Sequence, residues 1–292
     1  MSSPSFADLA AWFAEHRRDL PWRRPHVGAW GVLLSEVMSQ QTPVTRVAGP
    51  WTQWLERWPS PADLAAVPPA EVLRAWGSLG YPRRALRLQD CARTILERHD
   101  GVVPHHLADL RALPGIGEYT ASAVASFAYR QRVLVLDTNV RRVLGRAFFG
   151  EHHQRPAPSR AEKERSAALL PADAEQSVVW NEGVMELGAL VCKARAPLCG
   201  QCPWRRECAW VAGGSIVPAE RLTPVQPFEG TDRQVRGRIM KLLRADDAAS
   251  RTALAAASQV SPERFERVLN GLIADQLVHP GPADQVLLGP PR

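Results

Sequence analysis

The sequence of 292 residues predicts an all-α protein, and three observations lead to that fold class. Apolar residues recur at helical spacing through most of the chain. Ser, Thr or Asp followed by Pro or by an apolar run repeatedly marks a helix start. Extended apolar runs are few and short, the clearest being VLVL at residues 133–136. Hydrophobic residues make up 45% of the chain, so its helices can bury a core, and its length predicts about two domains.

Composition limits the class of protein that this chain can be. A net charge of +6 and an isoelectric point of about 9.4 suit a polyanionic partner, although many basic proteins bind nothing acidic. No apolar run approaches the ~18 residues that a membrane span requires, and the N-terminus lacks a basic stretch before an apolar core. We therefore expect a globular protein that is neither secreted nor inserted in a membrane.

The chain begins with a predicted amphipathic helix over residues 6–13, followed by a basic, proline-bounded connection over residues 17–25. Residues 30–41 form an apolar helix that is interrupted by Glu36. A carboxylate in such a helix is uncommon unless paired or functional, although an amphipathic helix also has a polar side on which a glutamate simply faces water. If Glu36 is enclosed, the loss of hydration raises its pKa and keeps it available as an acid.

Two further helix starts follow. Thr42 and Pro43 suit the N-cap and the first position of a helix that reaches Trp58. Ser60 and Pro61 repeat the same pattern at the start of the next helix.

A turn at residues 80–82 precedes a long basic helix. The arginines at the start of this helix would suit phosphate groups, although solvated charge is the commoner explanation for any one of them. They are Arg83, Arg84 and Arg87. Tyr81 in the turn is either a stacking residue or a plug, and Cys91, alone in a helical pattern, is expected in the core.

A glycine-rich turn, with Gly115 and Gly117, separates a predicted helix over residues 105–113 from a second over residues 119–129. Glycines at this spacing permit positive φ and let a ligand approach the backbone, while the next helix start presents unpaired N–H groups that attract phosphate. A short glycine motif also occurs in ordinary tight turns. The segment therefore predicts either a phosphate-binding hairpin or a simple connection.

The extended run at residues 133–136 ends at Asp137, and Val140, Val143 and Leu144 then recur with helical spacing. Asp137 therefore suits an N-cap. Such an aspartate either only caps its helix or also supplies a carboxylate to a site.

Four of the five cysteines gather in one short loop, separated by six, two and five residues: Cys192, Cys199, Cys202 and Cys208. In a reducing compartment, such clustering indicates a metal site rather than disulfides. Four thiolates in so short a loop suit either structural zinc or a four-iron four-sulfur cluster. Lys193 and Arg195 lie between the first two cysteines and suit a phosphate contact.

The rest of the chain gives weaker signals. A polar, proline-containing insertion at residues 152–160 precedes two helices, the second over residues 175–191. Residues 213–232 have the composition of a linker. Residues 233–292 give two apolar helix faces and a short β-like VLL, which predicts a small winged-helix-like unit. Such units bind DNA or serve only in packing, and we favour packing.

Seven motifs stand in one order over about residues 6–212: PWR from Pro21, SEVMSQQTPV from Ser35, LGYPRRA from Leu79, LPGIGEYTA from Leu113, LDTNVRRVLGR from Leu136, MELGALVC from Met185 and the cysteine loop. Together they closely resemble the MutY family of the helix-hairpin-helix/GPD superfamily. The resemblance implies a DNA glycosylase of base excision repair that removes adenine mispaired with 8-oxoguanine or G and leaves an abasic site.

That resemblance implies a two-lobed fold. A six-helix barrel with the hairpin would occupy residues 24–131, and an iron–sulfur domain would occupy residues 1–23 and 132–212. A linker at residues 213–232 would lead to the winged-helix-like unit at residues 233–292. The cysteine spacing matches the loop of the endonuclease III and MutY group, which implies a [4Fe-4S] cofactor rather than zinc.

The resemblance also implies roles for individual residues. Glu36 would protonate adenine, Asp137 would stabilise the oxocarbenium-like sugar, and Asn139 would be an orienting group nearby. Glycosidic cleavage needs both a protonated leaving group and negative charge beside the cation. Tyr119 stands where bifunctional relatives carry a lysine that forms a Schiff base, so a monofunctional enzyme is expected in which water attacks the sugar.

The resemblance also assigns DNA contacts. The target base must first leave the base stack, at a cost of a few kcal/mol. Residues that wedge into the duplex are matched by Gln40, Gln41 and Tyr81. Hairpin residues that grip the backbone are matched by Leu113, Gly115, Ile116 and Gly117. The implied partner is double-stranded DNA with an A:8-oxoguanine or A:G mispair, bound by a monomer in the cytoplasm at the nucleoid.

Two departures and two alternatives qualify this expectation. About 80 residues follow the cysteine loop, too few for the Nudix-like domain with which typical relatives recognise 8-oxoguanine, and Ser39 replaces a bulkier residue. A thymine or uracil mismatch glycosylase is one alternative, but Glu36 favours adenine because a pyrimidine leaves more readily as an anion. The other alternative, a non-catalytic DNA-binding module, is disfavoured because both carboxylates are present.

Overall fold

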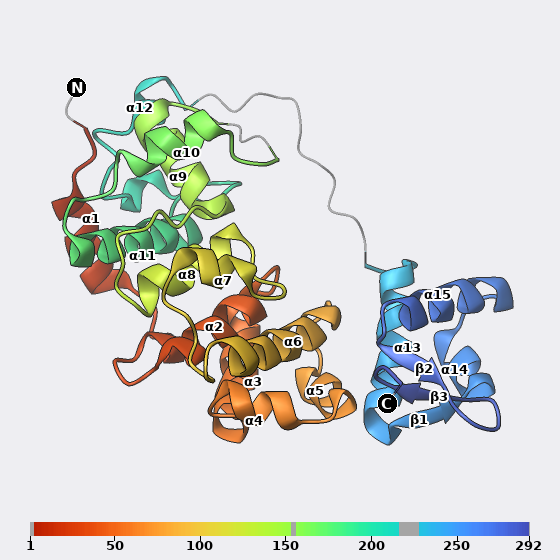
Figure 1. The fold of residues 1–292 in the computed structure, drawn as a ribbon. Coiled ribbons are helices and arrows are strands. Elements are labelled where there is room, and N and C mark those ends of the chain that lie inside the picture. The colour runs from red at the N-terminus through yellow and green to blue at the C-terminus, as the bar shows by residue number, and fades with distance from the viewer. Residues whose placement is uncertain (1–2, 153–155, 216–227, 292) are drawn as a thin grey trace. The chain divides into compact units, whose positions relative to one another are not determined.

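The computed structural model describes residues 3–152, 156–215 and 228–291, and these residues are mostly helical (Figure 1). The all-α prediction is confirmed. The chain divides into two compact units, one made of residues 1–32, 105–111 and 116–222, the other of residues 33–104, 112–115 and 223–292. The domain boundaries expected from the sequence were taken from the two lobes of the MutY family, and they stay a prediction.

The first unit is built around one long helix. Its helices are α1 (Phe6–His16), most of α7 (Leu107–Ala112), α8 (Glu118–Phe127), α9 (Thr138–Phe149), α10 (Arg160–Ala167), α11 (Ala174–Leu190) and α12 (Ala209–Ala212). Helix α11 packs against both α1 and α9. Glycines make this close approach possible, because a Cβ at Gly183 would lie 3.0 Å from Leu9 Cγ. The core between these helices is aromatic and aliphatic and includes Trp180, Leu187 and Trp204.

The second unit contains most of α2 (Ala29–Ser39), then α3 (Val44–Arg57), α4 (Pro61–Ala66), α5 (Pro69–Trp76) and α6 (Arg83–Arg98). Helices α4 and α5 both pack on α6. The N-cap predicted at Ser60 is confirmed, and the structure adds a capping box, since Ser60 and Asp63 exchange hydrogen bonds at the start of α4. Cys91 is fully buried in α6, as predicted.

The predicted N-cap at Thr42 is wrong. Helix α3 begins at Val44, its N-cap is Pro43, and no side chain caps it. The Thr42 hydroxyl instead bonds to the carbonyl of Leu79 at 3.1 Å, 37 residues away, because Thr42 is buried where two loops meet. A long-range partner has therefore replaced the local capping bond.

The C-terminal segment forms a small winged unit. Its elements are α13 (Asp232–Asp246), β1 (Ala248–Ser250), α14 (Arg251–Ser258), α15 (Pro262–Ala274), β2 (Val278–Pro280) and β3 (Gln285–Leu288). The strands pair antiparallel in the order β1-β3-β2. Most of the predicted linker, residues 216–227, lies outside the described residues, as does part of the polar insertion, residues 153–155.

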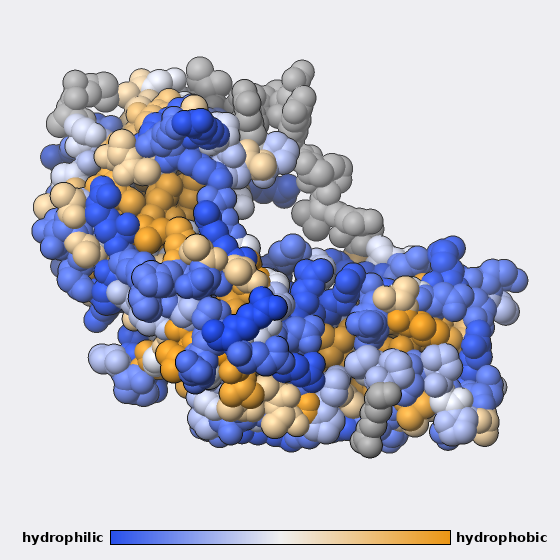
Figure 2. Space-filling view, viewed as in Figure 1, coloured by the Kyte–Doolittle hydropathy of each residue, from blue (hydrophilic) through white to orange (hydrophobic). Residues whose placement is uncertain are grey.

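The surface is largely polar. Hydrophilic residues cover most of the face drawn in Figure 2, with apolar side chains visible only in patches. Among the described helices, none is long and apolar enough to cross a membrane.

Candidate active site and cysteine cluster

Asp137 occupies the N-cap of α9, as its place in the sequence predicts. One carboxylate oxygen accepts from Val140 N–H at 2.6 Å, and the other accepts from the side-chain amide of Asn139 at 3.1 Å. Burial raises the pKa of Asp137 above its ordinary value, while these two hydrogen bonds and the charge of Arg142 act in the opposite direction. The structure thus brings together Asp137 and Asn139, two of the predicted site residues.

A polar path leads from Asn139 toward the cysteine loop. Arg142 donates to Asn139 Oδ1 and to the carbonyl of Gly188, both at 2.8 Å, and to the carbonyl of Cys192 at 2.7 Å. Gly188 has no room for a side chain, since a Cβ there would lie 2.8 Å from Asn139 Cβ. Sequence reasoning missed Arg142, although an arginine among the apolar positions of α9 is a signal that could have revealed it.

Arg146, one turn further along α9, supports the cysteine loop. It is only 2% exposed, donates to the carbonyls of Lys193 at 2.8 Å and Ala194 at 3.2 Å, and reaches Cys192 Sγ at 3.6 Å. Its guanidinium also lies over the ring of Trp210, 4.7 Å from the centroid. A buried arginine of this kind fixes the loop by donating to several of its carbonyls at once.

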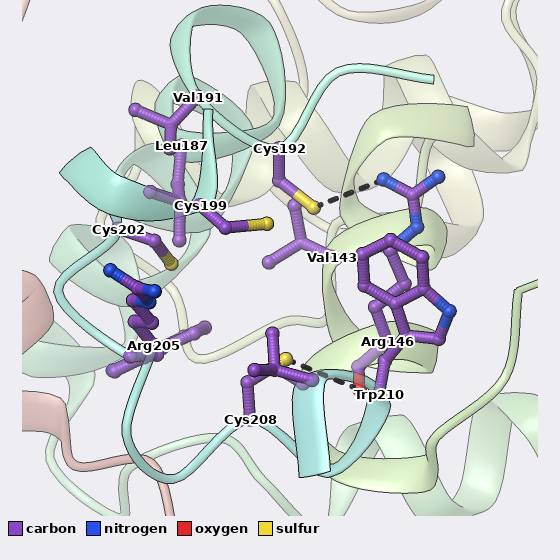
Figure 3. A pocket seen from close by; sticks show the side chains of 13 residues that line it. Val143, Arg146, Leu187, Val191, Cys192, Cys199, Cys202, Arg205, Cys208 and Trp210 are labelled. Atoms are coloured by element: carbon purple, nitrogen blue, oxygen red, sulfur yellow. Dashed lines mark hydrogen bonds between the residues drawn. The ribbon is translucent and has the colours of Figure 1, made fainter. Parts of the chain in front are cut away.

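The four clustered cysteines line one cavity, and their sulfur atoms face it (Figure 3). They come from the end of α11, a short 3-10 helix (Cys199–Gln201) and the N-cap of α12. Val143, Leu187 and Trp204 give the cavity apolar walls. Burial raises the pKa of Cys202 to about 12 and also raises the pKa of Cys208, so these are enclosed thiols rather than reactive surface groups.

The arrangement of the thiols bears on which metal group they suit. In the described part of the chain, no group of three or more His, Cys, Asp or Glu side chains is placed so that it could hold a metal ion. A four-iron cluster binds each thiolate through a different iron and needs an all-cysteine donor set lining a common cavity. The donor set and its cavity fit a cluster.

Lys193 and Arg195 are both exposed on the loop between Cys192 and Cys199. Arg146 holds the backbone of this loop by donating to the carbonyl of Lys193, and Arg146 itself is buried away from solvent. The two side chains are therefore presented to solvent from a supported backbone, and their contact with phosphate stays a prediction.

The glycine-rich hairpin differs from the prediction at one residue. Gly115 has a φ of +76°, and a Cβ there would also lie 3.1 Å from Arg87 Cβ, so glycine is required twice over. Gly117 is the N-cap of α8 with a φ of −87°, so the positive φ predicted for it is wrong. The side chains of Leu113 and Ile116 are buried, and a phosphate could meet these two residues only through their backbone.

Tyr119 lines a cavity of about 470 Å³ in the first unit, together with Leu107 of α7 and Leu136, the residue before Asp137. Glu118 beside it forms ion pairs with Arg111 at 3.0 Å and Lys163 at 2.5 Å. These pairs lower the pKa of Glu118. Leu136, which lines this cavity, directly precedes the N-cap residue Asp137 in the sequence.

Glu36 is buried in α2 and only 9% exposed. Its neighbours in the helix, Leu33, Val37 and Met38, are buried as well. The alternative of a glutamate on a solvated helix face is therefore wrong, because this helix has no exposed side at Glu36. A buried carboxyl needs compensation or a function.

Two loops of the second unit meet around Arg84. This arginine donates to the carbonyls of Val37 at 2.9 Å and Gly80 at 3.1 Å and to the Thr42 hydroxyl at 2.9 Å. It also donates to the carbonyls of Met38, Gln40 and Leu79. Desolvation lowers the pKa of Arg84 to about 10. The suggestion that Arg84 faces a phosphate or solvent is therefore wrong.

The residues predicted to wedge into DNA lie on these two loops. Gln41 has a φ of +56° and Tyr81 a φ of +46°, backbone conformations that residues other than glycine rarely adopt. Tyr81 is 47% exposed, and Arg84 lies 5.6 Å from the centroid of its ring. Arg84 thus brings the Gln40–Gln41 loop and Tyr81 together, and strained backbone of this kind concentrates at functional sites.

A second buried polar cluster was also missed from the sequence. Glu186 of α11 is fully buried and paired with Arg18 at 2.7 Å and Arg23 at 2.9 Å. Arg23 also lies 3.6 Å from Glu182, whose pKa is raised by burial. The PWR and MELGALVC motifs are therefore in contact, and the signal was the pair of acids, Glu182 and Glu186, one turn apart in an otherwise apolar stretch of α11.

Comparison with known proteins places the chain among repair enzymes. Residues 34–169 match the family described as HhH-GPD superfamily base excision DNA repair protein. The chain is 49% identical over 278 residues to the adenine DNA glycosylase of Mycolicibacterium smegmatis, across 94% of this chain and 93% of that one. It is 47% identical over 280 residues to the adenine DNA glycosylase of Mycobacterium tuberculosis, across 94% and 90% of the two chains.

Solved structures resemble the fold over most of the chain. A thermostable thymine-DNA glycosylase matches with a TM-score of 0.66 at 25% identity, covering 71% of this chain and 95% of that one. Endonuclease III, trapped in a covalent complex with DNA, matches with a TM-score of 0.61 at 26% identity, covering 72% and 95%.

Proposed function

The chain belongs to the HhH-GPD superfamily of base excision DNA repair proteins, and we propose that within it this chain is a monofunctional adenine DNA glycosylase. The enzyme binds double-stranded DNA, extrudes an adenine mispaired with 8-oxoguanine or G, and releases the base by hydrolysis to leave an abasic site. It works as a monomer in the cytoplasm, at the nucleoid. Relatives that match along 94% of the chain are named adenine DNA glycosylase, which supports the removal of adenine.

The observation that carries the chemistry is the Asp137 N-cap. Breaking an N-glycosidic bond leaves positive charge on the sugar, which a nearby carboxylate stabilises. Asp137 is held in one orientation by Val140 N–H and Asn139, so its charge is fixed before the substrate arrives. In this proposal Asn139 orients the carboxylate and Asp137 stabilises the sugar cation.

Glu36 is proposed to supply the proton. Adenine is a poor anionic leaving group and departs readily only when a ring nitrogen is protonated, which requires a general acid. A carboxyl buried in the apolar α2 is suited to that task. Tyr119 cannot form a Schiff base, so water attacks the sugar and the DNA strand remains uncut.

A [4Fe-4S] cluster is proposed on Cys192, Cys199, Cys202 and Cys208, whose sulfurs face one cavity. When bound, it would cross-link the loop between α11 and α12 and hold it rigid. Lys193 and Arg195 on that loop would contact phosphate, as would the backbone of Leu113, Gly115, Ile116 and Gly117 at the hairpin. Gln40, Gln41 and Tyr81 would enter the duplex beside the extruded base.

A thymine or uracil mismatch glycosylase remains the competing function, since a thymine-DNA glycosylase is among the similar structures. Four duplexes separate the two: A opposite 8-oxoguanine, A opposite G, T opposite G and U opposite G, each scored for base release. Adenine release supports the proposal, and preferential release of T or U overturns it. Release of no base would favour a non-catalytic binding module.

Three further measurements test the residue roles and the cluster. Glu36→Gln is expected to abolish adenine release while duplex binding is retained, and substantial residual turnover would remove Glu36 from the acid role. Borohydride should trap no covalent adduct with DNA, because Tyr119 offers no amine. Iron and acid-labile sulfide should accompany the purified protein, and zinc alone would refute the cluster.

A further inference from the structure

The segment that leads to Asp137 belongs to no sheet, although part of its backbone is enclosed. Residues 130–137 have no regular secondary structure, and the sheet found among the described residues lies in the C-terminal unit. Val135 in this segment is fully buried. A buried backbone without a neighbouring strand needs other partners for its N–H and C=O groups.

Asn181 of α11 supplies those partners. Its side-chain oxygen accepts from Val135 N–H at 3.2 Å, and its side-chain nitrogen donates to the Val133 carbonyl at 2.8 Å. The carboxamide therefore presents one acceptor and one donor to the segment, as the peptide of an adjacent strand would. Its second amide hydrogen is donated to Ser126 Oγ of α8 at 3.1 Å, and the side chain is only 1% exposed.

Helix α11 consequently contacts both sides of the Asp137 N-cap. On one side, Asn181 holds the backbone at Val135, two residues before Asp137. On the other side, Gly188 allows α11 to touch Asn139, two residues after Asp137. The helix itself is braced against α1, where Gly183 meets Leu9. A substitution at Asn181 would remove only the bonds to the segment before Asp137 and leave the contact between Gly188 and Asn139 in place.

We propose that Asn181 is a positioning residue for the glycosidic bond cleavage: its carboxamide takes the place of a neighbouring β-strand and sets the position of the Asp137 carboxylate beside the sugar. The inference rests on the proposed role of Asp137. A displacement of about 1 Å at a charged group is enough to reduce catalysis by about 100-fold. Loss of the Asn181 carboxamide should therefore lower base release much more than it lowers DNA binding.

The test compares Asn181→Ala with Ser126→Ala in the full chain with its metal group. Both remove buried hydrogen bonds of the same carboxamide, but Ser126→Ala leaves the bonds to Val133 and Val135 in place. The first readout is the single-turnover rate of adenine release. The second is the affinity ratio for two duplexes, one with a cationic pyrrolidine abasic analogue and one with a neutral tetrahydrofuran analogue. This ratio does not depend on the folded fraction, because both duplexes bind the same folded molecules.

Asn181→Ala should lower the release rate by about 10- to 100-fold and reduce the preference for the cationic analogue, with affinity for the neutral duplex retained. Ser126→Ala should preserve both the rate and the preference. An unchanged preference in Asn181→Ala, or an equal loss in both variants, would overturn the inference by reducing Asn181 to a stabilising residue. If Asn181→Ala does not fold, Asn181→Leu, which keeps the side-chain volume, is measured in the same way.

The same assay keeps the inference separate from the proposed function. Failure of the unaltered chain to release adenine would refute the function itself. Adenine release by the unaltered chain, combined with an unaffected Asn181→Ala variant, would refute only the role of Asn181.

Discussion

Arginine is used in opposite ways in the α9 region and in the C-terminal winged unit. In α9, Arg142 and Arg146 are buried and donate to backbone carbonyls of α11 and the cysteine loop. In the winged unit, Arg264 and Arg267 both pair with Asp232 near the surface. Buried donors to carbonyls cannot be replaced by water, whereas exposed ion pairs contribute little to stability. A net charge of +6 therefore says little about which arginines matter.

The largest expected difference between the two regions concerns their carboxylates. Asp137→Asn should reduce adenine release by at least about 100-fold, because the negative charge beside the sugar cation is lost. Asparagine is also a good N-cap, so α9 should remain folded. Asp232→Asn in the winged unit is the matched control and should leave release unchanged. Equal rates for the two variants in a single-turnover assay would contradict the assigned role of Asp137.

A glycine in each region gives the next contrast. Gly188→Ala places a Cβ 2.8 Å from Asn139 Cβ, so the start of α9 must move and base release should fall by about 100-fold. Gly237→Ala in α13 meets nothing within 4 Å and should raise the free energy of unfolding by about 0.5–1 kcal/mol, because alanine favours helix. Kinetic assays and urea unfolding check the two effects. A fully active Gly188→Ala variant would show that the contact with Asn139 does not position Asp137.

The buried arginines themselves can be compared with the exposed ones. Arg146→Met should lower the free energy of unfolding by about 2–4 kcal/mol, because the carbonyls of Lys193 and Ala194 lose their donor. Retention of iron by the variant should also be weakened. Arg267→Met should leave the unfolding midpoint unchanged within error. The comparison between the two regions fails if both substitutions have the same effect on that midpoint.

The smallest effect is a difference in the sign of a pH dependence. Burial raises the pKa of Asp137, so its ionisation costs stability above the raised pKa and costs nothing below the ordinary value. Arg264 and Arg267 lower the pKa of Asp232, so its contribution is present above the ordinary value and is lost as the pH falls through the lowered one. At neutral pH, Asp137→Asn should therefore stabilise and Asp232→Asn should destabilise. Unfolding curves from pH 3 to 7 should show both differences disappear toward acid.

Local signals in the sequence were sufficient for several features. The Ser60 N-cap and the Asp137 N-cap depend on residues within a few positions of each other, and the four cysteines lie in one short loop, so short-range chemistry determines them. For Glu36 the sequence left two alternatives open, a solvated or an enclosed carboxylate, and only the structure shows that it is buried. At the two N-caps and the cysteine loop, the local residue types and their spacing are sufficient to determine the structure.

The features that were missed depend on contacts between distant segments. Arg142 meets Cys192 50 residues away, and Arg84 meets Met38 46 residues away, so neither partner is visible in a local pattern. Thr42 was assigned a cap because its long-range bond to Leu79 is invisible in the same way. Gly117 was assigned a positive φ from its neighbour, although one left-handed residue was enough to turn the hairpin.

The carbonyls gathered on Arg84 have a consequence for how a duplex would be distorted. Arg84 donates to both loops at once, so neither loop can shift without breaking a bond to the cation that the other loop shares. Gln41 and Tyr81 stand on this braced corner in conformations already adopted before any partner arrives. For an enzyme that extrudes a base, this rigid corner would then stay in place, and the bending and unstacking would occur in the DNA duplex.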